Sequence, residues 1–251
     1  MSLKYQIGSD LDSPERTLEH GKLIRKKKFL RELYEEWYAF FQGELEDLPK
    51  GVIVELGSGG GFLKEKIRSV ICTDILPLPT NDFTFSALEM PFKDQELSAL
   101  LMIDTFHHIP DSEKFLTEAV RVLKTGGRII MIEPANSWWG RFIYKHFHHE
   151  PFNPNAGWTI PRSGPMSGAN GALPWIVFER DRDRLNRLFP NLERDFVRYH
   201  TPLRYLLSGG VSYRQLMPDF SYGFWKVTDT ILSRISRQFS MFMTVVLIKK
   251  S

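Results

Sequence analysis

Residues 52–61 read VIVELGSGGG, and this stretch decides the fold. Apart from Glu55, its first half is a short apolar run rich in β-branched side chains, which is typical of a strand buried on both faces. The glycines that follow let the backbone turn sharply and bring a ligand directly against main-chain N–H groups. A helix is expected over residues 62–68. The glycines therefore join a buried strand to a helix, a position that indicates a ligand-binding loop.

Strands and helices continue to alternate beyond this loop. Short apolar runs predict further strands at 70–73, 83–85, 99–103 and 128–133. The spacing of apolar residues predicts an amphipathic helix at 112–123. Strands that alternate with helices in this way favour a doubly wound, parallel α/β sheet of the Rossmann-like type.

The chain on either side of this core has a different pattern. Ser13 and Pro14 predict the start of a helix that runs over residues 14–48. Residues 135–178 are rich in Pro, Gly, Asn, His and Trp and show weak periodicity, which we interpret as a lid or binding loop. Regular spacing then returns and predicts helices at 178–189 and 224–239 and strands at 196–199 and 244–248.

These segments together predict a single domain over residues 1–251. Its expected parts are a helical N-terminal cap (14–48), a cofactor-binding half (50–134), a substrate lid (135–178) and a C-terminal half of the sheet (179–251).

The composition narrows the class of protein. The 251 residues carry a net charge of +3, which is below what a dedicated nucleic-acid binder usually carries. Cys72 is the single cysteine, which excludes an intrachain disulfide and a cysteine-based zinc site. No apolar run reaches the roughly 18 residues of a membrane-spanning helix, and residues 1–10 contain no apolar core of a secretory signal. We therefore expect a cytoplasmic protein with no nucleic-acid partner and no transmembrane segment.

A carboxylate ends the second predicted strand. Asp74 stands 17 residues after Gly57. An acid at the tip of this strand can accept hydrogen bonds from both hydroxyls of a ribose. Together with the glycine loop, Asp74 indicates an adenosine-containing cofactor at the carboxyl end of the sheet.

The residues around the loop discriminate between such cofactors. A dinucleotide-binding loop of the G-x-G-x-x-G type ends on a glycine, and Phe62 occupies that position here. Glu55 precedes the first glycine of the loop, where its charge would repel a pyrophosphate and attract an ammonium and a sulfonium. S-adenosylmethionine carries both of these cations. A nicotinamide-dependent oxidoreductase and a non-catalytic S-adenosylmethionine-binding protein remain as alternatives.

The sequence resembles the class I S-adenosylmethionine-dependent methyltransferases and, among them, the type 11 group. Five segments match in order: residues 52–61, Asp74, residues 87–94 (ALEMPFKD), residues 103–109 (IDTFHHI) and residues 121–128 (RVLKTGGR). The resemblance covers about residues 50–134. It implies a seven-stranded, mostly parallel sheet whose last strand, here 244–248, is antiparallel, and S-adenosylmethionine as the cofactor.

The resemblance also implies which residues surround the methionine part and the methyl group of the cofactor. The methionine part would lie against the loop residues Glu55, Gly57, Ser58, Gly59 and Gly61. The methyl group would lie near the tip of the fourth strand, at Asp104, Phe106 and His107.

A second set of residues is implied around the adenosine. Asp74 would hold the ribose and Ile75 would pack on the adenine face. Leu88 and Glu89 would lie beside the adenine. Many relatives have aspartate where Ser86 stands, so the backbone near Leu88 is expected to contact the adenine amino group instead.

His107 is the candidate catalytic residue. Imidazole titrates near neutral pH and can act as a general base. The resemblance also allows His107 to be a wall of the cofactor pocket. Because methyl transfer from a sulfonium is a direct in-line displacement, alignment alone can supply most of the acceleration. A base is needed when the acceptor is a poor nucleophile such as a hydroxyl.

The segment after residue 134 is the candidate acceptor pocket. We expect its lining to come from Trp138, Trp139, Phe142, Tyr144, His148 and Trp158. The lid that carries these residues would exclude water and select the substrate. His146 and Glu150, four residues apart on a helix, are the pair with adequate spacing for a metal. We expect no metal site.

The acceptor is expected to be a small molecule, with a sugar or a lipid-linked intermediate as the candidate classes. Arg141, Lys145, Arg162 and Arg204 would suit an anionic acceptor, although solvated surface cations are the common case. The apolar spacing of Trp225, Ile231, Leu232, Ile235 and Phe239 indicates core packing, or a partner or peripheral membrane contact if that face is exposed. The oligomeric state is left open.

Overall fold

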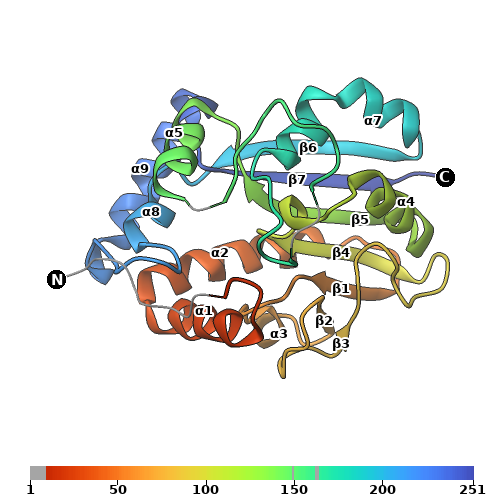
Figure 1. Ribbon diagram of the computed structural model, residues 1–251, viewed down its shortest axis with the longest axis horizontal. Helices are drawn as coiled ribbons and strands as arrows, with labels where there is room; N and C mark the ends of the chain where they lie inside the picture. The colour runs from red at the N-terminus through yellow and green to blue at the C-terminus, as the bar shows by residue number, and fades with distance from the viewer. Residues whose placement is uncertain (1–9, 149, 162–163) are drawn as a thin grey trace.

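A computed structural model describes residues 10–148, 150–161 and 164–251 of the protein. Arg162, one of the cations considered for an anionic acceptor, lies outside the described residues. At the centre of the fold is a seven-stranded sheet with the strand order β3-β2-β1-β4-β5-β7-β6 (Figure 1). The strands are β1 (Val52–Leu56), β2 (Val70–Asp74), β3 (Phe83–Thr84), β4 (Leu97–Ile103), β5 (Leu123–Pro134), β6 (Leu192–His200) and β7 (Phe242–Lys249).

The pairing of the strands confirms the predicted fold class. The strands from β3 to β5 pair in parallel, and β7 runs antiparallel to both β5 and β6. The strands β5, β6 and β7 are longer than predicted because their pairing continues past the apolar runs. The sheet is doubly wound and mostly parallel, with an antiparallel last strand.

The centre of the sheet is apolar and fully enclosed. Leu100 and Met102 of β4 and Ile130 of β5 have no exposed surface, as expected for parallel strands covered on both faces. Because β1, β2 and β4 are parallel, their carboxyl ends meet at one edge of the sheet. The loops after Leu56, Asp74 and Ile103 therefore lie together, which is where α/β sheets bind ligands.

The N-terminal region forms two helices where the sequence predicts one. Helix α1 covers Pro14–Lys26 and α2 covers Lys28–Glu44. The hydroxyl of Ser13 caps α1 by accepting from the Arg16 N–H at 3.2 Å. The backbone is extended at Lys27, whose buried ammonium donates to the carbonyls of Gly210 and Tyr213. This buried cation interrupts the helix at a position that apolar spacing alone does not reveal.

The remaining helices follow the strands in the expected order. In Figure 1, α1 to α3 lie on the β1 side of the molecule, and α4 and α7 lie on the β5–β6 side. The helix predicted at 178–189 begins with a π-helical turn (Ile176–Arg180), and the one predicted at 224–239 ends at Ile235 with a 3₁₀ turn after it (Arg237–Phe239). The α-helices are α3 (Leu63–Lys66), α4 (Ser112–Val122), α5 (Trp138–Phe147), α6 (Leu173–Trp175), α7 (Arg182–Leu188), α8 (Arg204–Ser208) and α9 (Tyr222–Ile235).

The segment expected as a lid begins with α5 and then crosses the carboxyl edge of the sheet. It is tied to the loop after β4 by backbone bonds from Ile160 N–H to Pro110 (2.9 Å) and from Asn170 N–H to His107 (2.9 Å). The Asp12 carboxylate, ahead of α1, accepts from the N–H groups of Met166 (2.7 Å) and Ser167 (2.8 Å). Distant parts of the chain thus meet above the edge where the loops after β1, β2 and β4 converge.

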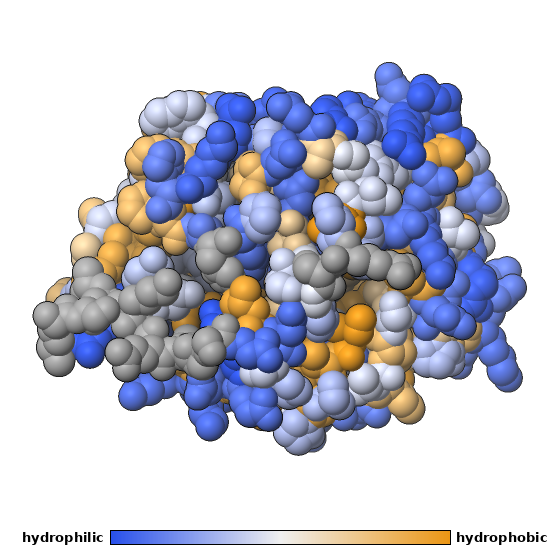
Figure 2. All heavy atoms as spheres, in the orientation of Figure 1, coloured by the Kyte–Doolittle hydropathy of each residue, from blue (hydrophilic) through white to orange (hydrophobic). Residues whose placement is uncertain are grey.

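The apolar face predicted on the last helix is largely exposed. Ile231 and Ile235 of α9 are 53% and 68% exposed, whereas Trp225 and Leu232 are half-buried. In Figure 2, apolar residues gather at the end of the molecule that α5 and α9 form. Within the described ranges, no helix combines the length and apolar character required to cross a bilayer.

Candidate cofactor and acceptor site

The loop after β1 is held in a shape that favours glycine. Gly57 and Gly59 have φ values of +67° and +49°. A Cβ built on Gly57 would lie 2.4 Å from Thr105 Oγ1, so a larger residue would collide with the loop after β4. The Ser58 N–H donates to the Thr73 carbonyl at 2.9 Å, which fixes this loop against the end of β2.

Asp74 connects the glycine loop to the tip of β2. Its Oδ2 accepts from the Gly59 N–H at 3.0 Å and its Oδ1 from the Leu76 N–H at 2.9 Å. Burial raises the pKa of Asp74 above its ordinary value and the backbone bonds oppose that rise. Asp74 lines a cavity of about 510 Å³, the larger cavity of the site, together with Ile75 and Leu88.

The larger cavity fits an adenosine. Ile75 and Leu88 supply apolar surface, and the Ser86 hydroxyl accepts from the Leu88 N–H at 3.2 Å. The Glu89 side chain points into solvent and Phe106 is fully buried beneath the loop. Within the described residues, neither Glu89 nor Phe106 lines a cavity at the site. The predicted contacts of these two residues with the cofactor therefore do not follow from the geometry.

Glu55 is a buried carboxyl group at the end of β1 that a cationic ligand would complement. Burial raises its pKa to about 7. The side chains that hydrogen-bond it, Ser58 and Cys72, are neutral. Glu55 lines a second, smaller cavity of about 170 Å³ with Ser58 and Gly61 of the loop. An ammonium or sulfonium in this cavity would supply the charge that burial makes unfavourable to leave unpaired.

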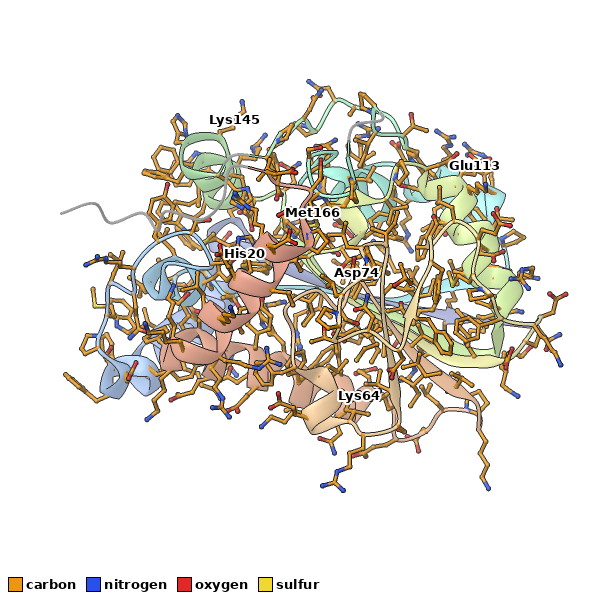
Figure 3. The ribbon with its side chains drawn as sticks, turned by 60° about the horizontal axis from the view of Figure 1, so that its bottom comes forward. His20, Lys64, Asp74, Glu113, Lys145 and Met166 are labelled. Carbon is orange, nitrogen blue, oxygen red and sulfur yellow. The ribbon has the colours of Figure 1, made fainter. Side chains whose placement is uncertain are left out.

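Asp104 lies where the two cavities meet. Both cavities are lined by Asp104 and Gly57, and also by Thr17, Gly59, His108 and Met166. Asp104 has a φ of +49°, a conformation that is rare and strained for a non-glycine residue and is found disproportionately at functional sites. Burial raises its pKa to about 8. Figure 3 shows Asp74, Met166 and His20 around this central part of the molecule.

His107 is held between two carboxylates. Its Nδ1 lies 2.7 Å from Glu133 Oε2 and its Nε2 lies 3.1 Å from Glu150 Oε2. Burial alone would lower the pKa of His107, but the bonds to Glu133 and Glu150 outweigh burial and raise it well above its usual value. Both ring nitrogens then donate, which leaves no lone pair for a substrate proton. The role of His107 as a general base stays a prediction, and in this arrangement both of its ring nitrogens face carboxylates.

Glu133 and Glu150 anchor this cluster from opposite sides. Glu133 Oε1 accepts from the N–H groups of Thr105 (2.9 Å) and Phe106 (2.7 Å), which orients the carboxylate beneath the loop. Burial would raise the pKa of Glu150, but His107 outweighs burial and holds it well below its ordinary range. Glu150 lines the smaller cavity.

His108 has a defined tautomer. Its Nδ1 lies 3.0 Å from the Gly168 carbonyl, which can only accept, so Nδ1 carries the proton. Its Nε2 lies 3.8 Å from Glu150 Oε1. Burial and the neighbouring His107 lower the pKa of His108 to about 4, so the ring is neutral at pH 7.

Two of the six residues predicted to line the acceptor pocket lie at the smaller cavity. Tyr144 and His148 line it, and the Tyr144 hydroxyl donates to the Met241 carbonyl at 2.6 Å. This places the inner face of α5 beside Asp104 and Glu150.

The other four predicted acceptor residues lie elsewhere. Trp138 is 61% exposed, and Phe142 stacks on Trp139, whose indole N–H donates to the Pro202 carbonyl at 2.9 Å. Trp158 donates to Asp181 at 2.9 Å. In the described part of the chain, none of these four aromatic residues lines either cavity. For the residues of α5 the reason is the helix geometry, since Trp138 and Phe142 face out whereas Tyr144 faces in.

The cations proposed for an anionic acceptor are also placed elsewhere. Arg204 is buried and pairs with Asp229 and Glu36, both at 2.8 Å. Arg141 and Lys145 lie on the exposed face of α5, and Figure 3 shows Lys145 pointing away from the molecule.

Several residues of the site carry no signal in the sequence. The walls of the smaller cavity include residues from both N-terminal helices, from α8 and from the loop after α8: Thr17, His20, Ile24, Tyr34, Tyr38, Tyr205 and Val211. Only the long-range packing of α1 and α2 on the glycine loop brings them there. Glu133 could have been noticed as an acid that ends an otherwise apolar strand.

Comparison with known proteins identifies a methyltransferase domain in this chain. Residues 54–131 match the family model of a methyltransferase domain. A demethylmenaquinone methyltransferase of Symbiobacterium thermophilum is 26% identical over 152 residues, which cover 60% of this chain and 58% of that protein. A tocopherol O-methyltransferase of Arabidopsis thaliana is 41% identical over 46 residues, or 18% of this chain and 13% of that protein. The chain thus spans less than two thirds of the length of these relatives.

The fold has a solved counterpart. The geranyl diphosphate C-methyltransferase of Streptomyces coelicolor, solved with S-adenosyl-L-homocysteine, superimposes with a TM-score of 0.52 at 13% identity, covering 96% of this chain and 86% of that one. The family match includes the glycine loop, Asp74 and Asp104, which are the residues around the two connected cavities. Residues 54–131 therefore match a methyltransferase domain, and the chain has the fold of an S-adenosylmethionine-dependent methyltransferase.

Proposed function

We propose that this protein transfers the methyl group of S-adenosylmethionine to a small molecule bound in the smaller cavity. The observation that carries the proposal is the junction of the two cavities at Gly57 and Asp104. A cofactor whose adenosine occupies the larger cavity would extend past this junction. Its reactive end would then face the smaller cavity.

Each part of the cofactor has a group of complementary chemistry. The Asp74 carboxylate would accept from the ribose hydroxyls, and Ile75 and Leu88 would pack on the adenine. Glu55 and Asp104 would face the two cationic groups. When bound, the cofactor supplies a methyl group on a sulfonium, which is activated for direct displacement.

The chain itself would align the reactants and exclude water. The smaller cavity is enclosed by aromatic side chains that include Tyr144, Phe152 and Tyr205. We propose that residues 135–178 act as the lid of the site, because Tyr144 and Phe152 reach the cavity from this segment. An in-line displacement in such a cavity gains mainly from orientation.

A small-molecule acceptor is supported by the lining and by the relatives. Aromatic walls suit an acceptor with an apolar or aromatic body. The names of two relatives, a demethylmenaquinone methyltransferase and a tocopherol O-methyltransferase, specify small-molecule acceptors. A lipid-linked acceptor is favoured over a free sugar because apolar and aromatic side chains such as Ile24, Tyr34 and Phe152 contribute to the walls of this cavity.

We further propose that the α5–α9 end of the molecule rests on an anionic membrane that carries the acceptor. Phe224, Val227, Ile231 and Ile235 line up along one exposed face of α9. Asp229, the acid of this helix, is buried, while the exposed surface of α9 carries Lys226 and Arg234. α5 has cations at its surface and no carboxylate in its sequence. Apolar side chains interspersed with cations are complementary to an interface of anionic lipids.

One set of experiments separates this function from its alternatives. Calorimetry with S-adenosylhomocysteine and with NAD should show binding of the former alone. Radiolabelled methyl groups from S-adenosylmethionine should then appear in one of a panel of quinol, phenol, sugar-linked and lipid-linked acceptors. Binding of NAD in place of S-adenosylhomocysteine would indicate an oxidoreductase. Tight S-adenosylhomocysteine binding with no transfer across the panel would indicate a non-catalytic binding protein.

A further inference from the structure

We infer that His107, His108 and Glu150 form a binding site for a divalent first-row transition-metal ion. The sequence directs attention to a different pair, His146 and Glu150. In the structure the His146 Nδ1 faces the carbonyl of Phe142 on its own helix, 2.8 Å away. Glu150 instead meets the two histidines at the tip of β4.

The donor atoms of the three residues are spaced like metal ligands. Glu150 Oε2 lies 3.1 Å from His107 Nε2, and Glu150 Oε1 lies 3.8 Å from His108 Nε2. One donor atom from each residue lies within 4.8 Å of the others. Tetrahedral ligands bonded to zinc at about 2.0–2.1 Å are roughly 3.4 Å apart. The observed separations bracket this value, so small side-chain movements would close the site around an ion.

The groups behind the histidines hold them as metal ligands are usually held. A metal-bound histidine commonly donates its second ring N–H to a carboxylate or a backbone carbonyl, which fixes its tautomer and orientation. The Nδ1 of His107 faces Glu133 at 2.7 Å, and the Nδ1 of His108 faces the Gly168 carbonyl at 3.0 Å. Both Nε2 atoms are therefore presented to the same carboxylate. An ion would take the place of the proton between His107 and Glu150.

The site is buried but open to the acceptor. The side chains of His107, His108 and Glu150 are 3%, 9% and 15% exposed. All three line the smaller cavity. Two histidines and one carboxylate leave coordination positions free for an exogenous ligand, as in catalytic zinc and iron sites. Those positions would face the space assigned to the acceptor.

The ion would select acceptors that present an oxygen, an extension that rests on the proposed function. As a Lewis acid it would lower the pKa of an acceptor hydroxyl, whose proton would leave to water. The oxygen lone pair would form the new bond to the methyl carbon. The sulfur would keep the electron pair of the bond that breaks. A bound ion would thus allow a hydroxyl acceptor to react although both ring nitrogens of His107 are engaged and cannot take its proton.

The ion site is tested by metal binding rather than by activity. The protein with all 251 residues is treated with a chelator, and Co²⁺ is added while the visible d–d absorption is followed. Zn²⁺ binding is measured by calorimetry. We expect one ion per chain and an intense absorption typical of four- or five-coordinate cobalt. The His108→Ala and Glu150→Gln variants should bind at least tenfold more weakly. Glu133→Gln, which removes the carboxylate behind His107, should weaken binding about 10–100-fold.

The matched control is His146→Ala, which removes a neighbouring histidine on α5 that lies outside the cluster, and it should bind Co²⁺ like the wild type. Far-UV circular dichroism and thermal unfolding, measured on each variant, report whether the fold is intact. Absence of Co²⁺ binding by the wild type, or equal affinity in the folded His108→Ala and Glu150→Gln variants, would overturn the ion site. Failure of the wild type to bind S-adenosylhomocysteine would instead overturn the proposed function and leave the metal result intact.

Discussion

The Asp74 carboxylate accepts a hydrogen bond from the backbone N–H of Gly59 at 3.0 Å. Asp74, which would bind the ribose, is thus held in place by the same loop that would lie against the methionine part of the cofactor. Because the second oxygen accepts from Leu76 N–H, the carboxylate is oriented before any ligand arrives. Such preorganisation reduces the entropy lost on binding.

Replacing Asp74 should therefore weaken cofactor binding strongly. We expect Asp74→Ala to raise the Kd for S-adenosylhomocysteine at least tenfold, since hydrogen bonds to a charged group are worth about 1.5–3 kcal/mol each. Isothermal titration calorimetry measures the effect. Asp47→Ala, which removes an exposed acid that lines neither cavity, is the matched control. Equal affinity in wild type and Asp74→Ala would remove Asp74 from the ribose site.

The approach of α1 to the glycine loop gives a second prediction. A Cβ on Gly60 would lie 2.4 Å from the Gly21 backbone N, whereas a Cβ on Gly43 in α2 would meet nothing within 4 Å. Gly60→Ala must push α1 from the loop, so we expect a loss of stability of a few kcal/mol and weaker cofactor binding. Gly43→Ala should be neutral or stabilising by up to about 1 kcal/mol. Thermal unfolding with and without S-adenosylhomocysteine compares the two, and a Gly60→Ala variant as stable as Gly43→Ala would contradict the close packing.

The strands and the cofactor loop could be predicted from the sequence because their signals are local. A short apolar run such as residues 99–103, in a chain where strands and helices alternate, indicates a buried strand, and Asp74 is placed by the end of its own strand. The pairing of parallel strands then brings Gly57, Asp74 and Asp104 to one edge without further information.

The acceptor side could not be predicted because it depends on contacts between distant segments. Glu150 reaches His107 across 43 residues of sequence. Tyr34 and Tyr205 reach the smaller cavity from opposite ends of the chain. The many aromatic residues at 138–142 correctly indicate an apolar surface, but they do not indicate whether that surface faces the cavity or the solvent. Trp138 and Tyr144 point to different sides of the same helix. Composition alone therefore cannot tell which aromatic residues of α5 face the cavity and which face solvent.

The buried carboxyl of Glu55 makes a third prediction about pH. Its pKa is about 7 in the folded protein and about 4.3 in an unfolded chain. Between these values the folded state holds a proton that the unfolded state has lost, so this group makes stability fall as pH rises from about 4 to 7. The Glu55→Gln variant has no carboxyl group at this position, so its stability does not decrease through this ionisation. The free energy of unfolding of the variant relative to wild type should therefore increase by up to about 3 kcal/mol from pH 4 to pH 8.

Urea denaturation at several pH values measures this difference, and the Glu46→Gln variant, which changes an exposed acid, serves as the control. A saturating cationic ligand that pairs with ionised Glu55 should reduce the pH-dependent difference in the free energy of unfolding between the variant and the wild type. Parallel pH curves for wild type and Glu55→Gln would show that Glu55 titrates normally in the folded protein.

The exposed face of α9 makes the last prediction, which concerns membranes. Vesicles that contain phosphatidylglycerol should sediment the protein, and neutral phosphatidylcholine vesicles should bind it less, because cations accompany the apolar side chains. The double variant Ile231→Asp, Ile235→Asp should bind at least tenfold more weakly, since each buried methylene contributes about 0.8 kcal/mol and each new carboxylate repels anionic lipid.

Leu188→Asp changes a side chain on α7 that is 43% exposed and is the matched control. S-adenosylhomocysteine binding should be unaffected in all three proteins, because α9 contributes nothing to the described lining of the two cavities. Equal sedimentation of the double variant and the wild type would show that this face does not contact the membrane.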